Sequence, residues 1–255
     1  MKKKIFKAML YLLCIFTLIS PIMAQAKTGK KDKPGTAIFV MSDIPCIMAT
    51  TKHISKDLST LYLDIKLPQL HGFSDTKFEK SLNHRFLKEG KSKATNAIHN
   101  AENYNKANLE DNIPPLKFEY LSNYTLIETV DPYFVIEFLD YEYSGGAHGL
   151  STQKYVVLDT INNEEVSLSS LFKANAPYKE IINEEINRQI IARTAKGEFF
   201  FTGSDGFSGI KDNVQFYINK YGQLVIVFNV YEIAPYAAGV VEFPINSDIL
   251  QSILK

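Results

Sequence analysis

Alternation of apolar and polar residues marks the strands of this chain. From Leu58 to Leu67, leucine and isoleucine alternate with tyrosine, aspartate and lysine, so one face is buried and the other meets water. The same pattern, or a short apolar run bounded by turn residues, predicts further strands, which are 116–121, 125–130, 133–143, 153–158, 214–218, 224–230 and 240–245. The segment 219–222 predicts the tight turn of a hairpin.

Helical spacing appears in fewer places. Phe78, Leu82 and Phe86 recur every four residues after Ser74 or Asp75, either of which can cap a helix. The pattern weakens but continues to about residue 105, with a glycine inside it. Further helices are predicted at 169–172, 178–195 and 248–254.

The strands gather around two main helices and do not alternate with them. This order favours an α+β fold of two small subdomains, each a mostly antiparallel sheet packed by one main helix. We place the subdomains at 36–150 and 151–255. A lysine-rich stretch over 27–35, ending in Pro-Gly, is expected to be a flexible linker before them.

The first 26 residues have the pattern of a signal peptide. Four lysines precede an apolar run over 8–19, and Ala24-Gln25-Ala26 matches an A-x-A cleavage site. The run is about 12 residues long, short of the roughly 20 that a membrane span requires. We expect cleavage, no membrane span afterwards, and a periplasmic or secreted location; a retained anchor is the alternative.

Charge and cysteine content then restrict the function classes. Without residues 1–26 the chain has 24 basic and 28 acidic residues, which argues against a nucleic-acid partner. Cys46 is the one cysteine left, so no internal disulfide can form, and we expect it to be buried as a small apolar side chain.

Two segments interrupt the strand pattern and carry the candidate binding residues. Residues 141–149 hold three glycines within five positions, which places His148 on a turn at a strand end. In residues 231–239, Pro235 stops ladder pairing and leaves tyrosines on a constrained loop. The alternative is a tight turn and a bulged crossover whose rings only pack. The candidate contacts are Tyr143, Ser144, His148, Tyr231, Glu232, Pro235 and Tyr236.

The sequence signals neither a metal site nor a cofactor. The five histidines lack the spacing of zinc ligands. Residues 206–210 nearly match G-x-S-x-G, but Ile210 stands where the last glycine belongs. An enzymatic alternative remains, in which His148 acts with Glu142 or Ser144 as a hydrolase of wall glycans or esters.

The two unusual segments resemble the signature stretches of the PdaC/RsiV-like family. Tyr143–Gly149 reads Y-S-G-G-A-H-G, and Tyr231–Gly239 reads Y-E-I-A-P-Y-A-A-G. Residues 61–72 resemble the opening of the family's first domain, and 166–172 the start of its second. The likeness spans about 45–250. Family members include the ectodomain of a lysozyme-sensing anti-sigma factor and a non-catalytic domain preceding some peptidoglycan deacetylases.

This resemblance implies an N-terminal PdaC-like domain over 36–150 and a C-terminal RsiV-like domain over 151–255. It implies an exported cell-envelope binding protein without catalysis, whose partner is a lysozyme-like protein or a peptidoglycan fragment. Residues 1–7 alone precede the apolar run, so we expect no sigma-binding segment, and from the length and motifs of the sequence we expect no deacetylase domain. We therefore expect the binding part alone.

Overall fold

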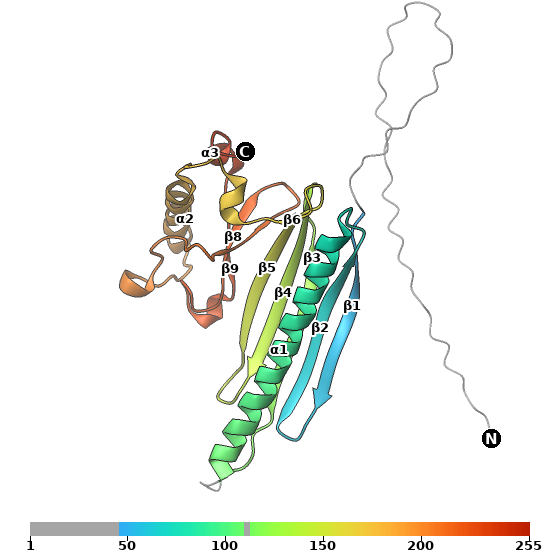
Figure 1. Cartoon of the computed structure of the whole chain (residues 1–255). Helices are drawn as coiled ribbons and strands as arrows, with labels where there is room; N and C mark the ends of the chain where they lie inside the picture. The colour runs from blue at the N-terminus through green and yellow to red at the C-terminus, as the bar shows by residue number, and fades with distance from the viewer. Residues whose placement is uncertain (1–45, 110–112) are drawn as a thin grey trace, which may run out of the picture. The chain divides into compact units, whose positions relative to one another are not determined.

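The computed structural model describes residues 46–109 and 113–255, which hold a six-stranded and a three-stranded sheet (Figure 1). The strands of the larger sheet follow one another in chain order and are β1 (Met48–Asp57), β2 (Leu61–His71), β3 (Phe118–Ile127), β4 (Tyr133–Tyr143), β5 (Leu150–Asp159) and β6 (Glu164–Glu165). Every neighbouring pair is antiparallel except β2 and β3, which are parallel.

The crossover between the parallel strands is the long helix α1 (Thr76–Leu109), which runs along one face of the sheet (Figure 1). Its buried side changes from large to small residues along the chain, from Leu82 and Phe86 to Gly90 and then alanines. A Cβ atom at Gly90 would lie 2.4 Å from the Leu67 side chain. The helix therefore approaches β2 closely, and its later apolar pattern is weak because small residues make the contact.

The three-stranded sheet has the order β7 (Gln215–Ile218), β8 (Leu224–Phe228), β9 (Val241–Pro244), all antiparallel. Helix α2 (Tyr178–Thr194) packs on it through Ile182 and Ile186, which are fully buried with the side chains of β8 and β9. Short helical segments complete this part, and they are η1 (Leu168–Leu171), η2 (Gly203–Asp205), η3 (Tyr236–Ala238) and α3 (Ser247–Leu250).

Strand β5 belongs to two cores. Val156 and Leu158 point to the side of α1 and pack with Leu82 and Phe86. Val157, between them, points to the other face and packs with Ile226 and the rest of the second subdomain. The two sheets are therefore joined by direct apolar packing on the outer face of β4 and β5.

These features confirm the α+β fold with two subdomains, each a sheet packed by one main helix. The subdomain boundary after residue 150 stays a prediction, and β5 lies beside it as a strand that pairs with β4 throughout. The signal peptide and linker fall outside the described residues.

Four expectations from the sequence were wrong in detail. Strand β1 was missed because nearly all its side chains are exposed, so it shows no alternation. The segments 116–121 and 125–130 form one strand, since Ser122 is buried inside it and donates to Asp140. The final helix ends at Leu250. Cys46 is exposed, because it precedes β1 at the edge of the sheet.

Within residues 46–109 and 113–255, none of the helices combines the length and the hydropathy that crossing a bilayer demands.

Asn105 anchors the end of α1 to the chain that enters β3. Its side-chain amide donates to Leu116 O at 2.8 Å, and its oxygen accepts from Leu116 N at 2.7 Å, in a buried setting. Asn105→Ala leaves both backbone groups without these partners, so the free energy of unfolding should fall by roughly 1–3 kcal/mol. Urea unfolding measures it. Asn100→Ala, on the exposed side of the same helix, should stay within about 0.5 kcal/mol of the original protein.

Candidate functional site

The first candidate segment forms the turn between β4 and β5. Gly145 and Gly146 have φ values of 110° and 89°, which side chains rarely tolerate, so glycine is required at both positions. The Tyr143 hydroxyl donates to Gly146 O at 3.2 Å and folds the turn back on the strand. Gly149 closes the turn in a buried position, where a Cβ atom would lie 2.4 Å from the Tyr141 ring.

His148 is exposed on this turn and held by one short hydrogen bond. Its Nδ1 lies 2.9 Å from the carbonyl oxygen of Gly149. Because a carbonyl oxygen only accepts, this contact assigns the proton to Nδ1. In the neutral ring, Nε2 is then a hydrogen-bond acceptor.

The second candidate segment follows β8. Tyr231 has a φ of 67°, an uncommon conformation for a residue with a side chain, and local hydrogen bonds hold it there. Asn229 N donates to Glu232 Oε2 at 2.8 Å, and Glu232 N donates to Asn229 O at 3.1 Å. Ile233 and Ala234 are buried in the core, so the loop returns to the surface at Pro235 and η3.

The fold brings the two segments into contact through their rings. His148 stacks on Tyr236 with centroids 4.1 Å apart and planes 23° apart. Tyr231 lies beside Tyr236 at 5.7 Å. The Tyr236 hydroxyl donates to Gly149 O at 3.4 Å, the same carbonyl that holds the imidazole. We call these three rings, His148, Tyr231 and Tyr236, the aromatic surface; its tyrosines keep 52% and 36% of their area exposed.

Side-chain amides hold the second subdomain against the part of the β5 edge that β6 leaves unpaired. Asn229 accepts from Gln153 N at 2.6 Å and donates to Gln153 O at 3.0 Å, as a neighbouring strand would. Gln215 accepts from Tyr155 N at 2.8 Å. These bonds satisfy the backbone of an edge strand and fix the position of the loop after β8 relative to the turn after β4.

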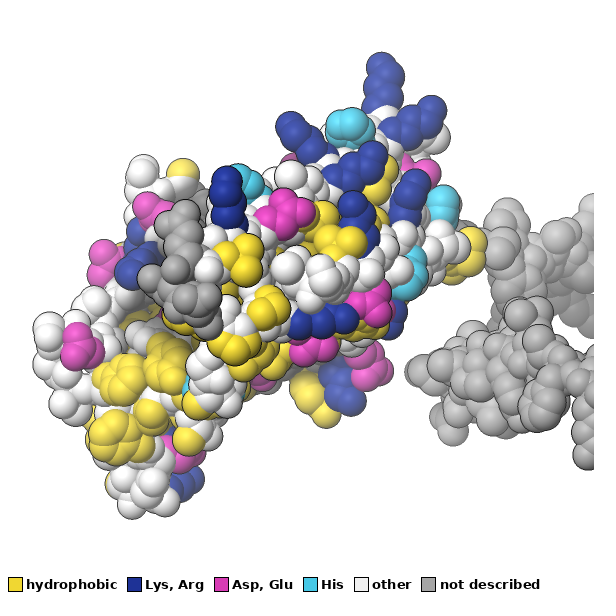
Figure 2. Space-filling model, turned by 90° about the horizontal axis from the view of Figure 1, so that it is seen from below, with side chains coloured by type: hydrophobic (Ala, Val, Ile, Leu, Met, Phe, Trp, Pro, Cys, Tyr) yellow, Lys and Arg dark blue, Asp and Glu magenta, His cyan; other side chains and the backbone are white. Residues whose placement is uncertain are grey.

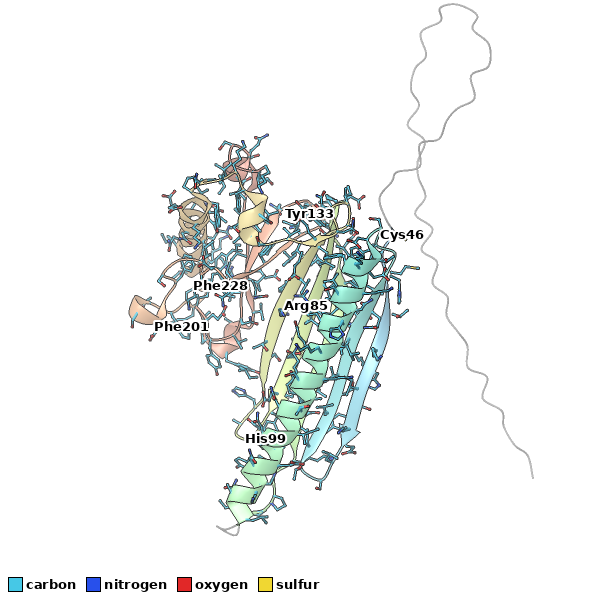
Figure 3. The ribbon with its side chains drawn as sticks, viewed as in Figure 1. Cys46, Arg85, His99, Tyr133, Phe201 and Phe228 are labelled. Atoms are coloured by element: carbon cyan, nitrogen blue, oxygen red, sulfur yellow. The ribbon has the colours of Figure 1, made fainter. Side chains whose placement is uncertain are left out.

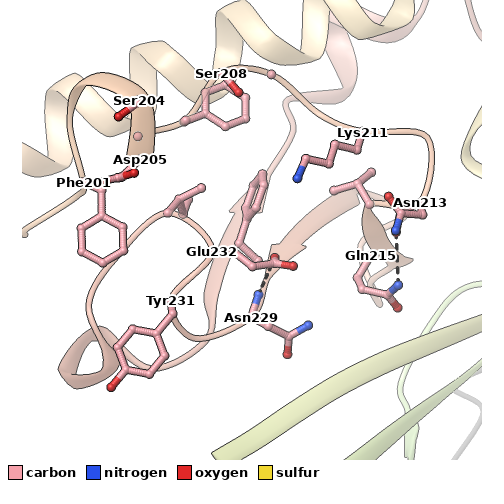
Figure 4. A pocket seen from close by; sticks show the side chains of 16 residues that line it. Phe201, Ser204, Asp205, Ser208, Lys211, Asn213, Gln215, Asn229, Tyr231 and Glu232 are labelled. Carbon is pink, nitrogen blue, oxygen red and sulfur yellow. Dashed lines mark hydrogen bonds between the residues drawn. The ribbon is translucent and has the colours of Figure 1, made fainter.

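An open cleft of about 730 Å³ lies next to Tyr231 and Glu232 (Figure 4). Phe201 stands at one side, while the Lys211 and Glu232 side chains reach toward its middle. Within the described part of the chain, Lys211 and Asp205 form no ion pair. The cleft thus offers aromatic faces and separate charges to a polar ligand, and its volume falls in the range of small-molecule sites.

The predicted contact residues fall into two groups. His148, Tyr231, Glu232 and Tyr236 lie together around the aromatic surface and the cleft. The other three lie in separate places, since Tyr143 bonds its own turn, Ser144 lines a hollow beside Asp140, and Pro235 lines a hollow beside Phe199. Their role in binding stays a prediction.

Sequence reasoning missed Asn229, Phe201 and Lys211. Asn229 stands directly after a fully apolar strand, where a polar side chain often bonds to the backbone at the strand end. Its position after the strand was the one feature of the sequence that could have indicated it. Phe201 and Lys211 lie in an irregular stretch, without periodicity to indicate that they face a cleft. Over 46–109 and 113–255, no group of three potential ligands has the geometry of a metal site.

A pair of carboxylates, half-buried Glu137 and exposed Glu242, lies where the two sheets meet. Burial, and then the nearby charge of Glu242, raises the pKa of Glu137 above its usual value. Tyr155 and Tyr217 stack beside them at 4.9 Å, and the Tyr217 hydroxyl donates to Glu242 at 3.2 Å. Burial, with the Glu242 charge, raises the pKa of Tyr217 to about 12. The junction therefore opposes ionisation of Glu137 more than water does.

Comparison with known proteins assigns the two halves of the chain to different family models. Residues 54–151 match the model described as deacetylase PdaC, and residues 169–248 match that of a protein of unknown function, DUF3298. The anti-sigma-V factor RsiV of Bacillus subtilis is 28% identical over 230 residues, covering 86% of this chain and 76% of that protein. The two models meet near the aromatic surface, since His148 lies in one and Tyr236 in the other.

Solved structures share the fold. A member of the DUF3298 family from Bacteroides fragilis superposes with a TM-score of 0.59 at 19% identity, over 83% of this chain and 94% of that chain. A DUF3298 family protein from Pseudomonas aeruginosa gives a TM-score of 0.51 at 17% identity, over 84% and 95%. At these identities the likeness concerns the architecture alone.

The carboxylate pair at the junction predicts a pH-dependent stability. A carboxyl whose pKa is higher in the folded than in the unfolded chain stabilises the fold at low pH, and this contribution is lost as pH rises through the raised value. Glutamine cannot ionise, so the Glu137→Gln variant avoids the cost of a charged carboxylate at the junction. Its melting temperature should therefore exceed that of the original protein at pH 7.5, and the difference should shrink toward pH 4.

Calorimetry at both pH values measures this effect. The control is Glu184→Gln on the exposed side of α2, which should melt with the original protein at each pH. An equal or lower melting temperature for Glu137→Gln at pH 7.5 would show that the junction tolerates the charge.

Proposed function

This chain belongs to the PdaC/RsiV-like family, and from that premise we propose that it is an exported binding protein of the cell envelope. Its partner is a lysozyme-like protein, held at the aromatic surface without a chemical reaction. The family relationship supports a binding role, and the signal-peptide pattern of residues 1–26 supports export.

The observation that carries this proposal is the stack of His148 on Tyr236. The two rings stand far apart in the sequence, at positions 148 and 236, and remain at the surface, although two family domains had to dock to bring them together. Tyrosine offers a large contact area at a small loss of conformational entropy, and clustered aromatic anchors often dominate binding energy. The glycines and Pro235 hold the loops in shape before binding, which lowers the entropy cost of association.

The anti-sigma-V factor similar to this chain suggests the class of partner. The family resemblance implies recognition of lysozyme-like proteins, and residues 113–255, which hold all three rings, carry ten basic and eighteen acidic residues. The net negative charge of this half of the chain favours a cationic partner and accelerates its association.

A peptidoglycan-derived glycan is the second candidate ligand, and the cleft beside Tyr231 supports it. A sugar ring could lie on Phe201 or Tyr231 while its polar groups meet Lys211 and Glu232. A soluble glycan fragment that displaces lysozyme would favour this ligand, whereas unaffected lysozyme binding would favour the protein partner.

Substitutions in the aromatic surface should weaken binding of lysozyme without unfolding the protein. Tyr236→Ala and His148→Ala should each raise the Kd about tenfold or more, because each removes an anchor from a desolvated contact. Titration calorimetry measures the affinity, and thermal melting should change little. The control, Tyr221→Ala, removes a 76% exposed tyrosine in the turn between β7 and β8. If the melting curves of the two site variants collapse, the rings belong to the core and not to a binding site.

A turnover assay separates binding from the hydrolase alternative. Catalysis by His148 calls for Ser144 or Glu142 nearby, and the hydrogen bond found for the imidazole goes instead to the Gly149 carbonyl. We therefore expect no release of acetate or reducing sugar when the protein is incubated with peptidoglycan. Turnover that His148→Ala abolishes would replace the binding proposal with the enzymatic one.

A further inference from the structure

The two flanks of helix α1 differ in how their charges are used. The flank that faces β4, β5 and β6 has its charged side chains in ion pairs, which are Arg85–Glu165 at 2.6 Å, Lys93–Asp140 at 2.5 Å and Glu89–Lys154 at 3.3 Å. Arg85 is labelled on this helix in Figure 3. The charges of this flank therefore tie α1 to the strands of the sheet.

The opposite flank carries a row of basic side chains. Its members are Lys77, Lys80, His84, Lys88 and Lys91. They are spaced three or four residues apart, as on one side of a helix, and all are exposed. We call this row the basic stripe; at 1.5 Å per residue it extends about 21 Å. The described residues supply no ion-pair partner for any member. The stripe is a continuous line of uncompensated charge.

Such a row does not help the helix to form. Like charges four residues apart, as at Lys80, His84 and Lys88 when the imidazole is protonated, destabilise a helix by about 0.2–0.5 kcal/mol per pair. The first turn gains nothing from cations either, because the helix dipole favours acidic groups there. Helix stability therefore does not account for these charges.

Strand β1 widens the charged surface. Lys52 and Lys56 pair in register with Leu67 and Leu63, whose side chains are buried under α1, so both lysines emerge on the same face as the helix. Leu87, on the stripe side of α1, packs in the cluster that also holds Ile54 of β1. The stripe with Lys52 and Lys56 forms what we call the basic face. Figure 2 shows Lys, Arg and His side chains gathered on one part of the surface.

The basic residues are in excess in the part of the chain that forms the basic face. Residues 46–109 hold ten basic and six acidic residues and four of the five histidines, whereas residues 113–255 are acidic. An opposite polarity within one small protein indicates two surfaces with different partners.

We propose that the basic face binds a linear polymer that carries phosphate groups along its length. The stripe contains lysine but no arginine, and lysine acts as a hydrated point charge that suits diffuse attraction more than bidentate recognition of one group. Between its members, the exposed residues are small and polar, such as Ser81 and Ser92. The stripe has no phenylalanine, tyrosine or tryptophan to stack on bases or enter a bilayer, so nucleic acid and membrane are poorer fits than a flexible polyanion.

The experiment is a titration of the purified protein with inorganic polyphosphate at several salt concentrations. The stripe variant is the triple Lys80→Gln, Lys88→Gln, Lys91→Gln. Each lysine that contacts phosphate contributes about 0.7–0.9 to the slope of log K on log salt, so the stripe variant should lower that slope by about two. The matched control replaces three exposed lysines of the other half with glutamine, and they are Lys196, Lys220 and Lys255.

Binding that weakens with salt, that drops in the stripe variant and that persists in the control variant would support the proposal. A double variant at Lys52 and Lys56, on a separate element, should weaken binding as well and covers the case in which the stripe variant unfolds. An equal loss in the control variant, or no binding at about 50 mM salt, would overturn it. Tighter binding to phosphatidylglycerol vesicles at equal phosphate concentration would also overturn it, in favour of a membrane surface.

Discussion

The part of the β5 edge that β6 leaves unpaired is the constraint on which the rest of this structure depends. An edge strand exposes backbone groups that need partners, and here the side-chain amides of Asn229 and Gln215 provide them. These amides belong to the second subdomain, so satisfying the edge also docks that subdomain. Apolar packing of Val135 and Val157 against Ile226 and its neighbours makes the joint continuous. Polar pairing fixes the register, and burial supplies most of the stability.

The aromatic surface is a consequence of that docking. His148 follows β4, which belongs to the first sheet, and Tyr236 follows β8, which belongs to the second. Their stack exists because both segments are tied to the same end of β5, through Gly149 on one side and Asn229 on the other. Any change in how the subdomains dock would separate the rings. This dependence links the junction, including the raised pKa of Glu137, to the proposed binding site.

The long helix plays two roles on its two flanks. One flank is tied to the sheet by ion pairs such as Arg85–Glu165, while the other presents the basic stripe to solvent. The acidic half of the chain carries the aromatic surface. A binding protein with these two surfaces could hold an anionic polymer at one face and a cationic protein at the other, because the two attractions do not compete for the same side chains.

The sequence by itself determined the fold class, most of the strands and both main helices, because alternation and helical spacing follow from local burial. It also indicated the two candidate segments, since glycine and proline restrict the backbone wherever they stand. Strand β1 was not predicted, because its exposed residues show no alternation of apolar and polar side chains. The later part of α1 showed a weak helical pattern, because Gly90 and alanines make its contact with the sheet. The stack of His148 on Tyr236 and the cleft beside Lys211 were decided by tertiary structure, since each joins residues whose proximity depends on how the chain folds back on itself.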